Sequence, residues 1–128
     1  MLNSIYRKIY QKIKKYDTIV VARHVGPDPD AVTTQIALRD SIKEKFPNKN
    51  VWCYTGFTFE EILGTTEPKS RAATDISKEM LSLIDVLVDG PFIEDLHSIT
   101  LKFRGSSNQR IIDIKKTAEQ KKIVLYLE

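Results

Sequence analysis

The stretch that decides the fold is "TIVVARHVGPDPDAVTTQIALRD", residues 18–40. It opens with a β-branched run of the kind found in buried parallel strands. A turn with two prolines follows, and then apolar and charged residues alternate at helical spacing. Pro29 stands where the first turn of a helix accepts proline. The stretch therefore predicts a strand, a tight turn and a helix, which is how a parallel α/β arrangement begins.

Apolar runs and helical patterns continue to alternate along the chain. Strand-like runs are "NVWCYTG" (50–56), "DVLVDGPF" (85–92), "RIIDI" (110–114) and "KIVLYL" (122–127). Helical spacing is found at 4–16, 30–46, 58–63 and 76–84. We predict a single three-layer α/β domain over residues 1–128, with about four mostly parallel strands flanked by helices. Its first three strands are expected to be joined by right-handed helical crossovers.

The composition is that of an ordinary globular domain. Of 128 residues, 41% are hydrophobic and 29% charged, and the net charge is +3. This excess is too weak to indicate nucleic-acid binding by itself. No apolar run approaches the roughly 20 residues needed to cross a bilayer, and the N-terminal segment lacks the apolar core of a secretory signal. Cys53 is the single cysteine, so no internal disulfide can form and we expect a cytoplasmic location without membrane contact.

Three marked segments follow the predicted strands, at the edge where parallel sheets bind ligands. They are "RHVGPDPD", "YTG" and "DGPF". The first holds His24, Asp28 and Asp30, a set that suits a cation such as Mn²⁺. Such a cation lowers the pKa of bound water and holds a phosphoryl oxygen. The alternative is that Asp28 or Asp30 caps the following helix.

Residues 9–51, from "IYQKIKKYDTIVVARHVGPDPDAV" onward, resemble the N-terminal segment of DHH-family phosphoesterases. The similarity is to the oligoribonuclease and phosphoadenosine-phosphate phosphatase type. His24, Pro27, Asp28, Asp30, Ala31 and Gln35 match the family pattern. The resemblance implies that His24, Asp28 and Asp30 ligate Mn²⁺. The family's Asp-His-His motif is missing from the rest of the chain, so residues 1–50 supply part of a two-metal site.

The remainder resembles the radical-SAM activating proteins of anaerobic ribonucleoside-triphosphate reductases. The matching segments are 48–63, 83–96 and 101–117, the last containing "RGSSNQR". The resemblance implies that Tyr54, Thr55, Gly56 and Asp89 lie on the S-adenosylmethionine side. It also implies that Arg104, Asn108 and Arg110 contact the partner reductase or an anion. From the residues alone, "YTG" is equally a plain strand exit, and the two arginines equally bind anionic groups at the surface.

The sequence departs from this second family at its cofactor. Radical-SAM chemistry needs three cysteines to hold a [4Fe–4S] cluster, and this chain has only Cys53, within a predicted strand. We expect no cluster, and hence no S-adenosylmethionine bound through one.

The two resemblances together indicate a chimera, with residues 1–50 like the phosphoesterases and residues 51–128 like the activating proteins. Both family sites are incomplete, which predicts a protein without activase activity. The resemblance to the activating proteins implies an anaerobic ribonucleotide reductase as partner. One alternative is a residual Mn²⁺-dependent phosphoesterase acting on short oligoribonucleotides or phosphoadenosine phosphate. Another is a non-enzymatic recombined scaffold.

Overall fold

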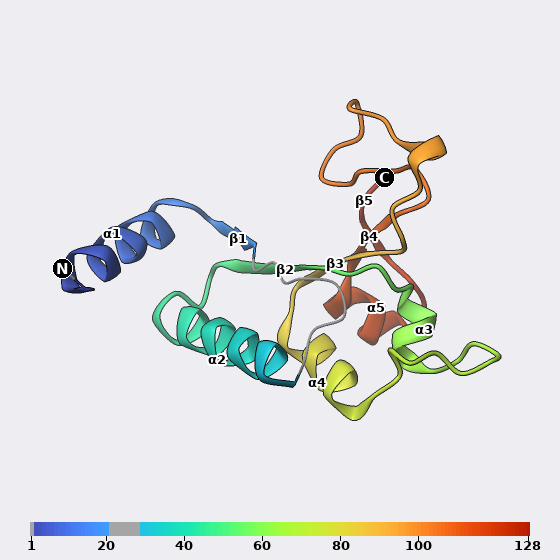
Figure 1. The fold of residues 1–128 in the computed structure, drawn as a ribbon, viewed down its shortest axis with the longest axis horizontal. Coiled ribbons are helices and arrows are strands. Elements are labelled where there is room, and N and C mark those ends of the chain that lie inside the picture. The colour runs from blue at the N-terminus through green and yellow to red at the C-terminus, as the bar shows by residue number, and fades with distance from the viewer. Residues whose placement is uncertain (1, 21–28) are drawn as a thin grey trace.

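The computed structural model describes residues 2–20 and 29–128, with side chains described within 4–20 and 37–128. These ranges contain five helices, five strands and one short 3-10 helix (Figure 1). The elements are α1 (Leu2–Lys15), β1 (Thr18–Val20), α2 (Pro29–Lys45), β2 (Asn50–Tyr54), α3 (Phe59–Leu63), α4 (Asp75–Leu83), β3 (Val86–Asp89), η1 (Glu94–Leu96), β4 (Arg110–Asp113), α5 (Ile114–Gln120) and β5 (Leu125–Leu127).

The strands form one sheet in the order β1-β2-β3-β4-β5. β1 pairs with β2 and β2 with β3 in parallel, which confirms the predicted arrangement of the first three strands. β4 is antiparallel to β3, and β5 is antiparallel to β4. The reason is that loop 90–109 contains only the short η1, so the chain re-enters the sheet from the edge at which it left. The prediction of a single α/β domain is confirmed, with five strands in the described residues.

Helices α2, α3, α4 and α5 lie on one side of the sheet, and loop 90–109 lies on the other (Figure 1). The core on the helical side is centred on Leu87 and Ile112, whose side chains are fully buried. The opposite face buries Trp52, whose ring is 5.4 Å from that of Phe103 and 5.3 Å from that of Tyr126. The sheet is therefore covered by a helical layer on one face and by loop and strand side chains on the other.

Local capping explains where the short helices begin. Thr58 accepts a hydrogen bond from the Glu61 backbone N–H, while the Glu61 carboxylate accepts one from the Thr58 N–H. This reciprocal capping box confirms the cap predicted at Thr58. Gly64 ends α3 in the left-handed conformation with φ +75°. The caps are local, so the sequence indicated this helix correctly despite its short length.

Helix α1 extends away from the rest of the molecule (Figure 1). Its apolar side chains Ile5 and Ile9 are half exposed, and Tyr10 contacts the ring of Phe46 at a centroid distance of 5.5 Å. Lys49 holds the end of this helix, because its ammonium group donates to the Tyr16 carbonyl. No helix in the described ranges is long and apolar enough to span a membrane.

Candidate functional site

The candidate site lies at the edge of the sheet where β2 and β3 end and β4 begins. Tyr54 ends β2 and Asp89 ends β3, and the two strands are parallel. Arg110 begins β4 and is the pairing partner of Asp89 across the antiparallel ladder. The fold therefore brings together residues that the sequence separates by more than fifty positions.

Asp89 and Arg110 form the centre of this edge. The Asp89 side chain is 1% exposed. One of its carboxylate oxygens accepts from Arg110 Nε at 3.0 Å, and the other accepts from the backbone N–H of Phe59 at 2.8 Å. Arg110 Nη2 also donates to Asp89 Oδ2. The two side chains thus share a forked arrangement, which is the strong form of a charged hydrogen bond.

Glu60 completes the network from α3. Its carboxylate accepts from Arg110 Nη1 at 3.1 Å and from Nη2 at 2.7 Å. The hydrogen bond from Arg110 lowers the pKa of Glu60, and the hydrogen bonds to Asp89 and Glu60 raise the pKa of the Arg110 guanidinium. Both shifts favour the charged forms of Glu60 and Arg110, and the arginine is fixed between the Glu60 and Asp89 side chains.

Gln109 connects the loop before β4 to the end of β3. Its side-chain oxygen accepts from the backbone N–H groups of Gly105, at 2.9 Å, and Ser106, at 3.2 Å. Its amide nitrogen donates to the Gly90 carbonyl at 3.1 Å. Gly90 has φ +90°, a conformation that favours glycine. The "RGSSNQR" segment therefore has a clear structural role, since it holds loop 90–109 closed on the strand end.

Arg104 and Asn108, predicted as partner or anion contacts, form hydrogen bonds inside this same loop. Arg104 Nη1 donates to the Gln109 carbonyl at 2.9 Å. Asn108 Nδ2 donates to the Pro91 carbonyl at 2.7 Å. Within the described part of the chain, Asn108 Oδ1 is buried without a hydrogen-bond partner.

The other predicted residues of the edge come from the end of β2. The Tyr54 hydroxyl donates to the Phe103 carbonyl at 3.1 Å, and burial raises the pKa of Tyr54. The Thr55 hydroxyl accepts from the Phe57 N–H at 3.2 Å. A Cβ at Gly56 would meet no atom within 4 Å, so open space lies beside this turn.

The predicted metal ligands His24 and Asp28 lie outside the described residues, as does the side chain of Asp30. The backbone at Asp30 belongs to the first turn of α2, which begins at Pro29 as predicted. Among the residues with described side chains, no group of three histidine, cysteine, aspartate or glutamate side chains is placed to hold a metal ion. The manganese site stays a prediction.

Cys53 does not fit an iron–sulfur cluster. It lies in β2, is 8% exposed and belongs to the core between sheet and helices. Its sulfur is 3.9 Å from that of Met80. A cubane cluster is held by several thiolates, and this sequence contains one cysteine, which faces the helical core. The residues of this chain therefore cannot supply such a ligand set.

Glu60 and the role of Gln109 were not predicted from sequence. The only local signal at Glu60 is its position in the first turn of α3, which any capping carboxylate shares. Its partner Arg110 is fifty residues away. The sequence near either residue does not indicate a contact between residues so far apart in the chain.

By its fold the chain is a small α/β domain, and its strand ends meet at an arginine clamped between two carboxylates. A family model for a 4Fe-4S single cluster domain matches residues 4–112. The chain therefore belongs to the 4Fe-4S single cluster domain family. No solved structure matches the chain.

Two kinds of curated relatives are similar to parts of the chain. The anaerobic ribonucleoside-triphosphate reductase-activating protein of Salmonella typhi is 37% identical over 81 residues, which are 63% of this chain and 46% of the relative. The same-named protein of Escherichia coli K12 is 36% identical over 81 residues, with the same coverage. The chain thus spans less than half the length of these relatives.

A probable bifunctional oligoribonuclease and PAP phosphatase of Streptococcus mutans is 32% identical over 90 residues, which are 70% of this chain and 28% of the relative. Because matched stretches of 90 and 81 residues exceed 128 together, the two similarities share part of the chain. The likeness to both kinds of protein therefore extends into a common segment.

Proposed function

We propose that this chain is a cluster-free member of its family that binds an anaerobic ribonucleotide reductase without generating a radical. The observation that carries the proposal is the single cysteine, Cys53, which is buried in the hydrophobic core. The similarity to reductase-activating proteins supports the choice of partner. Under this proposal, the strand ends that form the cofactor side in the family have only a structural role here. The residues concerned are Tyr54, Thr55, Gly56 and Asp89.

The first test is anaerobic reconstitution of the purified chain with iron and sulfide. We expect no stoichiometric cluster by iron analysis or by electron paramagnetic resonance, because one thiolate cannot hold a cubane. The activating protein of Escherichia coli, treated in parallel, is the positive control. A stoichiometric cluster that cleaves S-adenosylmethionine would contradict the proposal.

Partner binding is tested separately by isothermal titration with an anaerobic ribonucleotide reductase. Arg104→Ala and Asn108→Ala are expected to weaken the complex if these residues contact the reductase. Lys12→Ala on α1 is the matched surface control. Absence of any complex with the intact chain would refute the partner while leaving the cluster result unaffected.

A second candidate is a Mn²⁺-dependent phosphoesterase using His24, Asp28 and Asp30. The similarity to the Streptococcus mutans phosphatase favours it. Bound Mn²⁺ would stabilise the folded state by mass action, so the melting temperature should rise with the metal. Asp28→Asn combined with Asp30→Asn should abolish this rise and any hydrolysis of phosphoadenosine phosphate. An unchanged rise in the double variant would rule out these ligands.

The chimeric origin of the chain, with segments 1–50 and 51–128, is part of the same proposal. The similarity to two different kinds of enzyme supports a mixed origin, whereas the overlap of the two matched stretches does not place the boundary at residue 50. In the sheet, β1 lies in the first segment and pairs along its length with β2, which begins at the proposed boundary. Separately expressed segments that remain unfolded alone, and fold when mixed, would support one domain built from both.

A further inference from the structure

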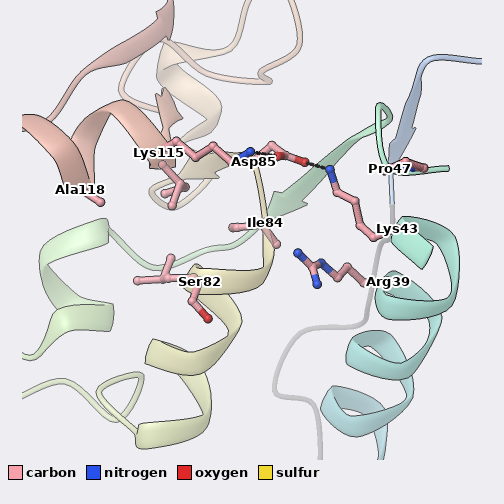
Figure 2. A pocket seen from close by; sticks show the side chains of 10 residues that line it. Arg39, Lys43, Pro47, Ser82, Ile84, Asp85, Lys115 and Ala118 are labelled. Carbon is pink, nitrogen blue, oxygen red and sulfur yellow. Dashed lines mark ion pairs between the residues drawn. The ribbon is translucent and has the colours of Figure 1, made fainter. Parts of the chain in front are cut away.

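A groove runs along α4 and α5 on the helical side of the molecule, and one end of it reaches Glu60 of the strand-end site. A cavity of about 360 Å³ opens between α2, α4 and α5 (Figure 2). A second cavity of about 550 Å³ lies between α3, α4 and α5. Both are lined by Leu81, Ser82, Ile114 and Ala118, so they meet along α4 and α5. We call this continuous depression the α4–α5 groove.

The floor of the α4–α5 groove is apolar. Ile84 and Pro47 line the first cavity, and Phe59, Leu63 and Ile123 line the second. Leu63 is 37% exposed, so apolar surface is available there to a partner. Burial of such surface is the main source of binding free energy in protein interfaces.

Six cations border the α4–α5 groove along its whole length. They are Arg39, Lys43 and Lys115 at the first cavity and Lys78, Lys121 and Lys122 at the second. Two carboxylates line it, and both are held by ion pairs within the protein, Asp85 by Lys43 and Glu60 by Arg110. Lys43 and Lys115 also pair with Asp85, and Arg39 pairs with Asp40, so within the described residues the excess positive charge of the groove comes from Lys78, Lys121 and Lys122 at the second cavity.

Arg39 supplies a donor that the described part of the protein leaves unused. Its side chain extends from α2 toward Ile84 (Figure 2). Nη1 pairs with Asp40 at 2.6 Å, but Nε is buried without a hydrogen-bond partner in the described residues. A buried N–H without a partner is costly, and an incoming carboxylate would satisfy it.

We propose that the α4–α5 groove binds an acidic amphipathic helix of a partner protein. An apolar floor with charges on its borders is how amphipathic helices are held in grooves. The cations are distributed over two cavities instead of converging on one point, which favours an extended ligand with several carboxylates over a single phosphate group. The proposal is independent of the cluster, of the metal and of the reductase.

The probe is a fluorescein-labelled synthetic peptide with leucines at i, i+3, i+4 and i+7 and glutamates at the other positions, the pattern that helix-binding grooves select. Binding is measured by fluorescence anisotropy with the full chain. We expect saturable binding that weakens with salt. A peptide with lysines in place of glutamates, and one with the leucines scrambled, should both bind much more weakly.

Two triple variants with equal changes in net charge locate the binding surface. Lys78→Glu with Lys121→Glu and Lys122→Glu should weaken the peptide complex about tenfold or more, since each reversed pair becomes repulsive. Lys8→Glu with Lys12→Glu and Lys15→Glu on α1 is the matched control and should change affinity less than about twofold, because these lysines lie outside the groove.

Ala118→Glu places a carboxylate where the two cavities meet, on an exposed helical position that accepts glutamate. It should weaken binding strongly, and Ala118→Gln, which has nearly the same size, should weaken it less. Circular dichroism establishes that each variant is folded. Equal loss in both triple variants, or equal binding of all three peptides, would overturn the proposal. Failure of the acidic peptide to bind would also overturn it. So would a stable dimer in sedimentation equilibrium that Ala118→Glu dissociates, because a second copy of the chain would then cover the groove.

Discussion

Strand β3 has an aspartate at each end, the partly buried Asp85 and the fully buried Asp89, and the two are held in different ways. Asp89 at its carboxyl end is clamped by the planar guanidinium of Arg110. Asp85, one residue before the strand, accepts from the Val51 N–H at 2.7 Å and pairs with Lys43 at 2.8 Å and Lys115 at 3.5 Å (Figure 2). The first end is closed by a rigid fork, and the second is bordered by flexible lysines beside a cavity.

This difference indicates which end of the sheet has a structural role and which end borders a surface for binding. An arginine fork fixes two carboxylates with directional hydrogen bonds, whereas lysine is a point charge on a flexible chain. The Asp89 end is therefore a structural closure in this chain. At the Asp85 end the paired cations are lysines, Lys43 and Lys115, and both border the α4–α5 groove.

The largest expected effect is that of Arg110→Met, which leaves the fully buried Asp89 carboxylate without its cation. Breaking a buried pair in this way should lower the free energy of unfolding by about 3–5 kcal/mol. The measurement is urea denaturation followed by circular dichroism. The double variant Arg110→Met with Asp89→Asn removes the stranded charge and should cost less than the single one. A loss below about 1 kcal/mol in Arg110→Met would mean that the fork is not a structural closure.

The corresponding change at the other end is Asp85→Ala, with a smaller expected effect. It removes the acceptor of the Val51 N–H and the ion pair with Lys43, and we expect a loss of about 1–3 kcal/mol. Asp85→Asn keeps an oxygen for the Val51 N–H and should lie between Asp85→Ala and the parent. If Asp85→Ala costs as much as Arg110→Met, the two ends are equivalent and the comparison fails.

Acid should weaken both ends, in a direction fixed by the pKa shifts. Burial acts to raise the pKa of Asp85, but the hydrogen bonds from Lys43 and from the Val51 N–H outweigh it, so the pKa is lowered. The pKa of Glu60 is lowered by Arg110. Their ordinary values are 3.8 and 4.5. Because the unfolded state binds protons first, this stability is complete above these values and is lost as pH falls below them.

The urea midpoint should therefore be constant near neutral pH and fall with acid below about pH 4.5. Glu60→Gln should flatten this decline, since Glu60 and Asp85 are the carboxylates with lowered pKa among the described side chains. Glu119→Gln, on an exposed turn of α5, is the control and should leave the profile unchanged. A urea midpoint that rises on acidification would contradict the lowered pKa values of Asp85 and Glu60.

The smallest effect is expected for Lys115→Ala. The Lys115 side chain is 76% exposed and its ammonium is 3.5 Å from Asp85. Exposed pairs of this kind contribute little, so the free energy of unfolding should change by less than about 0.5 kcal/mol. A larger loss would indicate that Lys115 is part of the support of Asp85 and not a cation available to a ligand.

Much of the fold was predictable because its signals are local. The β-branched run at Thr18–Val20, the cap at Thr58 and the stop at Gly90 are read from a few neighbouring residues. The charged stretch before β5 shows no helical spacing of apolar residues, yet it forms α5, capped by Asp113. Its apolar contacts are few and come from tertiary packing, which a seven-residue pattern does not reveal.

The candidate site was predictable only in part. Asp89 was indicated by its position after a buried strand, where ligand sites of parallel sheets occur. Its neutralisation by Arg110, and the contribution of Glu60, depend on β4 returning antiparallel and on the docking of α3. Both depend on how distant segments pack, and neither is encoded near the residues concerned.

The aspartates at the two ends of β3 also determine how this strand is aligned with its neighbours in the sheet. Val86, Leu87 and Val88 are apolar and buried on both faces of the sheet, so they lack the inside–outside alternation that normally penalises a slipped strand. A shift of one residue would exchange similar side chains, but it would pull Asp85 or Asp89 away from its cation and into apolar surroundings. The charged residues at the two ends of this uniformly apolar strand thus specify its register with the neighbouring strands.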